Sequence, residues 1–254
     1  MTSEQNLNII YSTNTISMKP LFILTSALNT KFGVHSNEQR LQQTIDSVAS
    51  IRRYCPEASV AVVEMGGIPS TVEQITTLEN LVDYYYNFSD NEAVQGIFHS
   101  TENWDIVKNT TEVMIFGELL TQLTEAKIPE QFDRIFKMSG RYQLTERFDP
   151  GYYDTVPDRI VVLERKNSQF PAQVTDGMEY QYMSRLWSWP AAQTDAIIDS
   201  YTRGFVGMAQ RLDAGGYFDI EHMLYYYLPT DLVTQIPFVG LRGLLGPNGT
   251  QIED

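Results

Sequence analysis

Residues 21–27, LFILTSA, form an apolar run of the kind typical of a fully buried strand. Two similar runs follow, SVAVVEM at residues 59–65 and VDYYY at residues 82–86. Between the first two, Ser36 and Gln39 form a capping-box pattern, and apolar residues spaced by four and three then mark one face of a helix. A second, shorter helix is expected before the third run. This alternation of strands and helices predicts a parallel sheet covered by helices.

The ligand site is expected at the carboxyl ends of these strands, because parallel sheets of this kind bind ligands at that edge. The polar side chains there are Thr25, Ser26 and Asn29 after the first strand, and Glu64 at the end of the second. We predict that they face a ligand. Ordinary strand-end hydrogen bonding is an equally good explanation for Thr25 and Ser26.

Residues 132–142, FDRIFKMSGRY, predict another strand that ends at the same edge. Its apolar run breaks into Lys137, Ser139, Gly140 and Arg141. A glycine lets the backbone approach a ligand closely, and the arginine offers a planar fork for phosphate or carboxylate. The segment therefore favours an anion-binding loop over the alternative, a strand followed by a solvated turn.

The rest of the chain predicts an α/β fold that ends in a mixed part. We expect a loop at 87–105, a helix at 106–126, strands at 159–167 and 179–189, helices at 190–212 and 218–228, and a loop or short strand at the end. Residues 1–19 are expected to be a polar tail, and residues 20–254 a single domain.

Lys108 and Glu112 are four residues apart near the start of the predicted helix at 106–126. This spacing favours a solvated ion pair on the helix surface. The alternative is that both side chains face the ligand, in which case Lys108 belongs to the binding site.

The charge of the chain excludes several classes of partner. The net charge is -14 and the sequence pI is about 4.6, so polynucleotides and anionic membrane surfaces are not expected partners. The one cysteine, Cys55, excludes an intrachain disulfide and favours a structural thiol over a nucleophile. Without a signal-peptide pattern or a transmembrane run, we expect a soluble, cytoplasmic protein.

Several catalytic motifs are missing from the sequence. There is no G-x-S-x-G, H-E-x-x-H, G-x-x-x-x-G-K-[ST] or G-x-G-x-x-G, which argues against a serine hydrolase, a zinc site, a nucleoside triphosphatase and a Rossmann dehydrogenase. Trp187 and Trp189 alternate on a predicted strand and so share one face. Core packing is favoured for them over stacking on a sugar.

Asp219, Glu221 and His222 form the densest cluster of catalytic residue types. In one interpretation Asp219 caps the helix at 218–228 and His222 is a satisfied core histidine. In the other, Glu221 or Asp219 is a general base on an acceptor hydroxyl, and His222 holds a diphosphate or, as a weak candidate, a metal.

These segments together resemble the nucleotide-sugar-dependent glycosyltransferases of GT-A fold. The resemblance is carried by LFILTSALNTKFG, by EQRLQQTIDSVASIRRYCPEASVAVVE and by FDRIFKMSGRYQL, and it covers residues 20 to 250 roughly. More narrowly, the chain resembles a glycosyltransferase-like group found in viruses and marine microbes, which has a K-x-S-G-R-Y signature. The ending, IEHMLYYYLP followed by VGLRGLLGPNG, also fits that group.

The resemblance implies transfer of a sugar from a nucleotide-sugar donor to a hydroxyl acceptor such as a glycan. Thr25, Ser26 and Asn29 would hold the base and ribose. An Asp-x-Asp motif that binds Mn or Mg is usual in the family, but KMSGRY stands in its place here. Lys137 and Arg141 could neutralise the diphosphate instead, so that no metal is needed, or the activity could be lost.

Two other classes of function remain open from the sequence. One is a non-catalytic protein that binds nucleotide sugars or glycans on the same fold. The other is a nucleotidyltransferase-type α/β enzyme, for which a nucleoside triphosphate would be the ligand.

Overall fold

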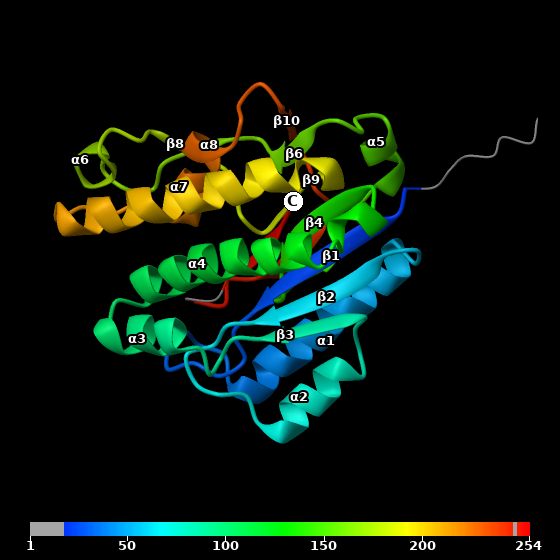
Figure 1. Ribbon diagram of the computed structural model, residues 1–254, viewed down its shortest axis with the longest axis horizontal. Coiled ribbons are helices and arrows are strands. Elements are labelled where there is room, and N and C mark those ends of the chain that lie inside the picture. Colours follow the sequence, from blue (N-terminus) through cyan, green and yellow to red (C-terminus); the bar gives the residue numbers. More distant parts are fainter. Residues whose placement is uncertain (1–17, 246–247) are drawn as a thin grey trace, which may run out of the picture.

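The computed structural model describes residues 18–245 and 248–254, and its first part follows the predicted alternation of strands and helices (Figure 1). Ser36 and Gln39 make the predicted capping box, with each side chain accepting a hydrogen bond from the other residue's backbone N–H. The elements of this part are β1 (Pro20–Ser26), α1 (Asn37–Tyr54), β2 (Ser59–Glu64), α2 (Val72–Glu79) and β3 (Tyr84–Asn87). Residues 1–17 of the expected polar tail lie outside the described residues.

The predicted loop at 87–105 is largely helical, so that prediction is wrong. It contains α3 (Glu92–Ser100) and the start of α4 (Trp104–Glu125). Each helix has an asparagine N-cap: Asn91 accepts from the N–H groups of Ala93 and Val94, and Asn103 caps α4 in the same way. The helices were missed because polar residues obscure the apolar period, although the capping asparagines are a usable signal.

The central sheet has seven strands in the order β10-β6-β9-β4-β1-β2-β3. All strands except β9 run in the same direction. Opposite β1, Ser26 pairs with Glu64 of β2, and Thr25 pairs with Ser139 of β4. The polar ends of three strands therefore meet at one edge, as the sequence predicted.

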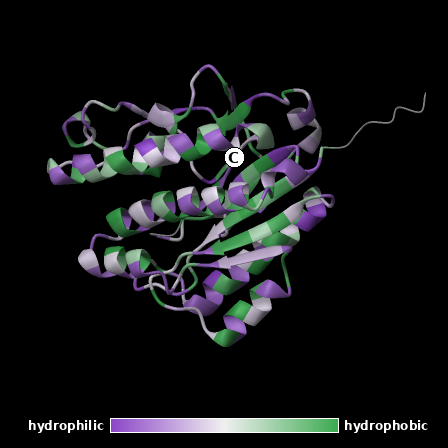
Figure 2. Cartoon of the chain, viewed as in Figure 1, coloured by the Kyte–Doolittle hydropathy of each residue, from purple (hydrophilic) through white to green (hydrophobic). Residues whose placement is uncertain are grey.

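Side-chain alternation along β1 divides the core into two layers. Leu21 and Ile23 pack on one face with α4, α7 and α8, whereas Phe22 and Leu24 pack on the other face with α1 and α2. Figure 2 shows that the central strands are largely hydrophobic along their length, whereas hydrophobic and hydrophilic residues alternate along the helices. A sheet that is covered on both faces explains why these strands appear as continuous apolar runs.

The second part of the chain is mixed, as predicted, but its strands are shorter. The strand predicted at 159–167 is split between β6 and β7, and the one at 179–189 between β8 and β9, because β7 and β8 leave the central sheet and pair with each other. The elements are η1 (Pro129–Gln131), β4 (Arg134–Ser139), β5 (Tyr142–Leu144), α5 (Pro150–Asp154), β6 (Ile160–Leu163), β7 (Lys166–Asn167), α6 (Ala172–Thr175), β8 (Tyr180–Gln181), β9 (Leu186–Pro190), η2 (Ala191–Gln193), α7 (Thr194–Asp213), α8 (Ile220–Tyr227), β10 (Val233–Ile236), β11 (Leu241–Leu244) and β12 (Gln251–Glu253).

The two tryptophans on β9 belong to the core, as favoured from the sequence. Trp187 and Trp189 are buried, and their ring centroids lie 4.7 Å apart. They pack near Phe116 of α4 and Tyr201 of α7, so stacking on a bound sugar is excluded for both rings.

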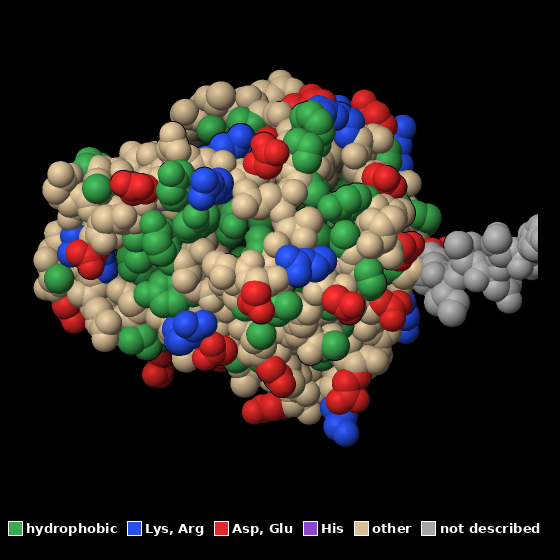
Figure 3. All heavy atoms as spheres, turned by 90° about the horizontal axis from the view of Figure 1, so that it is seen from above, with side chains coloured by type: hydrophobic (Ala, Val, Ile, Leu, Met, Phe, Trp, Pro, Cys, Tyr) green, Lys and Arg blue, Asp and Glu red, His purple; other side chains and the backbone are tan. Residues whose placement is uncertain are grey.

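The architecture confirms the predicted α/β fold, with a mostly parallel sheet covered by helices and a mixed C-terminal part. No helix in the described residues is long and apolar enough to cross a membrane. On the face shown in Figure 3, acidic and basic side chains are scattered, and the described residues there form no extended basic patch.

Candidate active site

A cavity of about 960 Å³ opens at the carboxyl ends of β1 and β4. The first turns of α4 and α8 and the segment between β8 and β9 complete its wall. This volume is in the range of small-molecule sites, and the sheet edge is where the sequence placed the ligand. The predicted site residues that line it are Thr25, Ser26, Lys108, Ser139, Gly140, Arg141, Asp219 and Glu221.

Two of the predicted donor-binding residues stabilise loops and do not line the cavity. The buried carboxylate of Glu64 accepts hydrogen bonds from the backbone N–H groups of Leu28, at 3.0 and 3.2 Å, and Gly66, at 2.8 Å. The Asn29 amide exchanges hydrogen bonds with the Gln74 side chain and also donates to a backbone carbonyl. Both side chains hold the chain where it leaves β1 and β2, contrary to the expectation that they contact a donor.

Lys137 lies in the protein interior and does not reach the cavity. Strand alternation turns its side chain toward α4, where its ammonium is 2.5 Å from the Glu112 carboxylate. It also donates a hydrogen bond of 2.8 Å to the carbonyl of Ser184. The expected direct contact between Lys137 and a phosphate is therefore not supported by its position, because the side chain is buried and already paired.

Lys108 and Glu112 do not form the predicted solvated pair. Glu112 is buried, pairs with Lys137 and accepts a hydrogen bond of 3.1 Å from the Thr25 hydroxyl. Burial alone would raise the pKa of Glu112, but the charges of Lys137 and Lys108 lower it to about 2. Both Lys108 and Glu112 line the cavity, as the alternative to a solvated pair requires.

The Lys108 ammonium is held by a neutral partner, the side-chain oxygen of Asn109 at 3.1 Å. Burial acts to lower the pKa of Lys108, yet the carboxylates of Glu221 and Glu112 raise it above its usual value. Lys108 is therefore a charged group at the cavity wall, close enough to Glu221 for the two charges to interact.

Arg141 follows β4 at the cavity wall, as the sequence predicted. Its Nε is buried and has no hydrogen-bond partner among the described residues. Gly140 also lines the cavity, and a Cβ there would lie 3.2 Å from the Thr25 carbonyl and from the Thr44 hydroxyl. Gly140 thus allows β4 to leave the sheet close to β1 and α1.

The other cations at the cavity have partners or are exposed. Arg40 donates to three backbone carbonyls of the loop after β1, and Lys31 pairs with Glu102. Arg185 pairs with Asp254 at 3.1 Å. Lys166 is exposed on β7. Among the described residues that line the cavity, Lys108 and Arg141 are therefore the two partly buried cations without a direct carboxylate partner.

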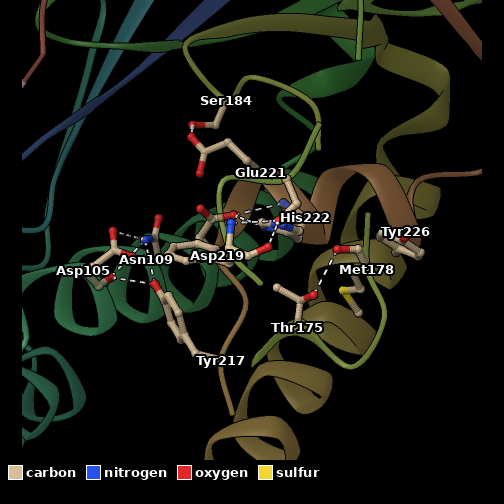
Figure 4. A network of polar contacts seen from close by, with 12 residues as sticks. Asp105, Asn109, Thr175, Met178, Ser184, Tyr217, Asp219, Glu221, His222 and Tyr226 are labelled. Carbon is tan, nitrogen blue, oxygen red and sulfur yellow. Dashed lines mark hydrogen bonds and ion pairs between the residues drawn. The ribbon is translucent and has the colours of Figure 1, made fainter. Parts of the chain in front are cut away.

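Asp219 and His222 form a closed polar chain at the start of α8 (Figure 4). One oxygen of Asp219 accepts from the His222 backbone N–H and lies 2.6 Å from His222 Nδ1, while Nε2 is 2.8 Å from the Ser168 hydroxyl. Burial acts to raise the pKa of Asp219, but the hydrogen bonds and charge of His222 lower it. These contacts confirm the helix cap and the satisfied core histidine.

Ser168, His222 and Asp219 are hydrogen-bonded in the order found in the catalytic triad of a serine hydrolase. Neither Ser168 nor His222 lines the cavity, however. His222 is buried, and Ser168 Oγ also accepts from the Phe170 backbone N–H at 2.9 Å. With both ring nitrogens occupied, His222 is no metal ligand, and the arrangement is structural.

Glu221 is the carboxylate best placed for proton transfer. Its Oε1 accepts a hydrogen bond of 2.5 Å from the Ser184 hydroxyl, and the residue lines the cavity (Figure 4). Burial raises its pKa above the usual value, although Lys108 acts in the opposite direction. A carboxylate with a raised pKa inside a ligand-sized cavity is a general-base candidate.

Sequence reasoning missed Asp105, which lines the cavity at the first turn of α4. The side-chain amide of Asn109 donates one hydrogen bond to the Asp105 carboxylate, at 3.0 Å, and another to the Tyr217 hydroxyl (Figure 4). Burial raises the pKa of Asp105. The Asn103 cap, which predicts where α4 begins, was the signal that could have placed Asp105 near the site.

The residues present do not fit a divalent metal at the strand end. The described residues contain no group of three or more His, Cys, Asp or Glu side chains arranged to hold an ion. At the position where Asp-x-Asp would supply oxygen ligands, β4 ends in Lys137, Met138 and Ser139. The cation that follows β4 at the cavity is Arg141, because Lys137 is buried and paired with Glu112.

No family model matches the chain, and no curated protein matches it. Among solved structures, core-mannan synthase A (CmsA/Ktr4) from Aspergillus fumigatus, in its Mn/GDP form, is similar with a TM-score of 0.45 and 9% sequence identity. The similarity covers 89% of this chain and 74% of that chain. A likeness at this level carries no functional argument, so the function is argued from the residues of this chain.

Proposed function

We propose that residues 20–254 form a glycosyltransferase domain that moves a sugar from a nucleotide-sugar donor to a hydroxyl acceptor. The observation that carries the proposal is one ligand-sized cavity that contains both Glu221, with its raised pKa, and two cations without a direct carboxylate partner among the described residues, Lys108 and Arg141. A buried base suits deprotonation of a hydroxyl, and the two cations suit a diphosphate leaving group.

In the proposed reaction, Glu221 takes the proton of the acceptor hydroxyl while the acceptor oxygen bonds to the anomeric carbon of the sugar. The bond between that carbon and the diphosphate oxygen breaks, and the diphosphate leaves with the electron pair. Lys108 and Arg141 stabilise the charge on the leaving group, a part that the resemblance to GT-A glycosyltransferases would give to a divalent cation. Thr25 and Ser26 lie at the end of β1 and are the proposed contacts for the nucleoside.

The binding part of the proposal is tested by thermal unfolding with UDP-, GDP-, CDP- and dTDP-sugars, each with manganese and with a chelator. A nucleotide sugar at one hundred times its dissociation constant should stabilise the protein by about 2.7 kcal/mol. We expect one nucleotide class to raise the melting temperature, and the shift to persist in the chelator because the cations come from the protein.

Arg141→Ala is the informative variant, and Arg53→Ala is its matched control because Arg53 is exposed at the end of α1 and does not line the cavity. Loss of a charged hydrogen-bonding partner is worth about 1.5–3 kcal/mol, so Arg141→Ala should weaken binding roughly ten- to a hundred-fold. Stabilisation by nucleoside triphosphates alone would instead favour a nucleotidyltransferase, and equal binding by both variants would refute the assignment of Arg141.

A further inference from the structure

A continuous chain of polar contacts runs beneath the cavity from β1 to α8. Thr25 donates to Glu112 at 3.1 Å, and Glu112 pairs with Lys137 at 2.5 Å. Lys137 donates to the Ser184 carbonyl at 2.8 Å, and the Ser184 hydroxyl donates to Glu221 at 2.5 Å. The buried ion pair is thus connected through one serine to the candidate base.

Ser184 is well suited to this link because its carbonyl accepts from Lys137 and its hydroxyl donates to Glu221. It lies between β8 and β9, in a segment without regular secondary structure, so its position depends on contacts from outside the segment. Its relative exposure is 4%, and that of Lys137 is 0%. The bond from Lys137 to the carbonyl fixes the backbone, which leaves the hydroxyl aimed at Glu221 (Figure 4).

We propose that Ser184 is a positioning residue for Glu221: its hydroxyl orients the carboxylate and stabilises the ionised form, and Lys137 holds Ser184 in place from β4. This inference rests on the proposed function, in which Glu221 takes the acceptor proton. It also gives Lys137 a function that its buried position allows, in place of the phosphate contact expected from the sequence.

The charged and titratable groups around Glu221 set the direction of the effect. Burial is the largest influence and raises the pKa of Glu221. Lys108 of α4 lowers it, Asp219 of α8 raises it, the Ser184 hydrogen bond lowers it, and Glu112 of α4 raises it. Lys137 of β4 and Tyr201 of α7 also interact electrostatically with Glu221. Removing the Ser184 hydroxyl removes a bond to the ionised form, so the pKa of Glu221 should rise.

The direct test is a carboxyl ¹³C NMR titration of protein labelled with ¹³C-glutamate. Glu221→Gln assigns the Glu221 signal by removing it. We expect the Glu221 pKa to be higher in Ser184→Ala than in the wild type, and to return toward the wild-type value in Ser184→Thr, which keeps a hydroxyl. Thermal unfolding confirms that each variant is folded. An unchanged Glu221 pKa in a folded Ser184→Ala protein would overturn the inference.

The second readout uses whichever of the UDP-, GDP-, CDP- or dTDP-sugars the wild type turns over. In Ser184→Ala the acid limb of kcat/KM should move to higher pH, and part of the loss should remain at high pH, where Glu221 is ionised in both proteins but is no longer oriented by the hydroxyl. A uniform loss at every pH would indicate a merely structural function for Ser184 and overturn the inference. The titration needs no turnover, so absence of any turnover counts against the proposed function alone.

Discussion

At the scale of single residues, the buried pair of Glu112 and Lys137 explains why a lysine can stand near the end of a strand in an acidic protein. An ionised lysine in the interior is costly unless a counter-charge and further hydrogen bonds compensate. Glu112 supplies the charge, and the Ser184 carbonyl supplies a hydrogen bond. The same arrangement places a carboxylate beneath Lys108, which helps to keep that cavity cation protonated.

Glu112→Gln should destabilise the protein in a pH-dependent way. The pKa of Glu112 is lowered in the folded state from an ordinary 4.5 to about 2, so its ionised form stabilises the fold above pH 4.5 and the contribution is lost as the pH falls toward 2. The shift corresponds to about 3 kcal/mol at neutral pH. Urea unfolding of wild type and variant at pH 7 and near pH 2 measures it.

The control for this prediction is Glu118→Gln on the same helix, because Glu118 is exposed and, among the described residues, its side chain is hydrogen-bonded only to Gln122 one turn further along. Its unfolding free energy should follow the wild type at both pH values. A Glu112→Gln effect of equal size at pH 7 and pH 2 would contradict the assignment of the ionised pair.

At the scale of elements, the start of α8 positions Glu221, the proposed general base. Asp219 caps the helix and holds His222, and these contacts fix the first turn from which Glu221 projects into the cavity. The sequence predicted this cap from Asp219 alone. It did not predict the contact between His222 and Ser168, because these two residues are 54 positions apart in the chain and no local pattern connects them.

Asp219→Ala should therefore destabilise the protein by about 2–4 kcal/mol, the sum of a lost helix cap and a buried histidine left without its partner. Asp219→Asn is the matched control, since an asparagine also caps helices and retains an oxygen for His222. Chemical denaturation with a far-UV readout compares the three proteins. A loss for asparagine as large as that for alanine would show that the cap contributes little.

At the scale of the whole molecule, the fold brings polar strand ends from distant parts of the chain to one edge of the sheet. The sequence was sufficient to predict that edge, because buried parallel strands appear as apolar runs with polar ends. It placed Arg141 and Glu221 at the cavity correctly. It could not show that Lys137, Asn29 and Glu64 turn away from it, because that depends on partners such as Glu112 and Gln74, which come from other elements.

The central claim is that this edge of the sheet binds a nucleotide sugar and that Glu221 carries out the proton transfer. The most direct measurement is release of nucleoside diphosphate from the stabilising nucleotide sugar, compared between wild type and Glu221→Gln. We predict that Glu221→Gln binds the nucleotide sugar with nearly unchanged affinity but turns it over at least about a hundred-fold more slowly, as expected for loss of a general base. Equal turnover by the two proteins, or binding without turnover by the wild type, would contradict the account.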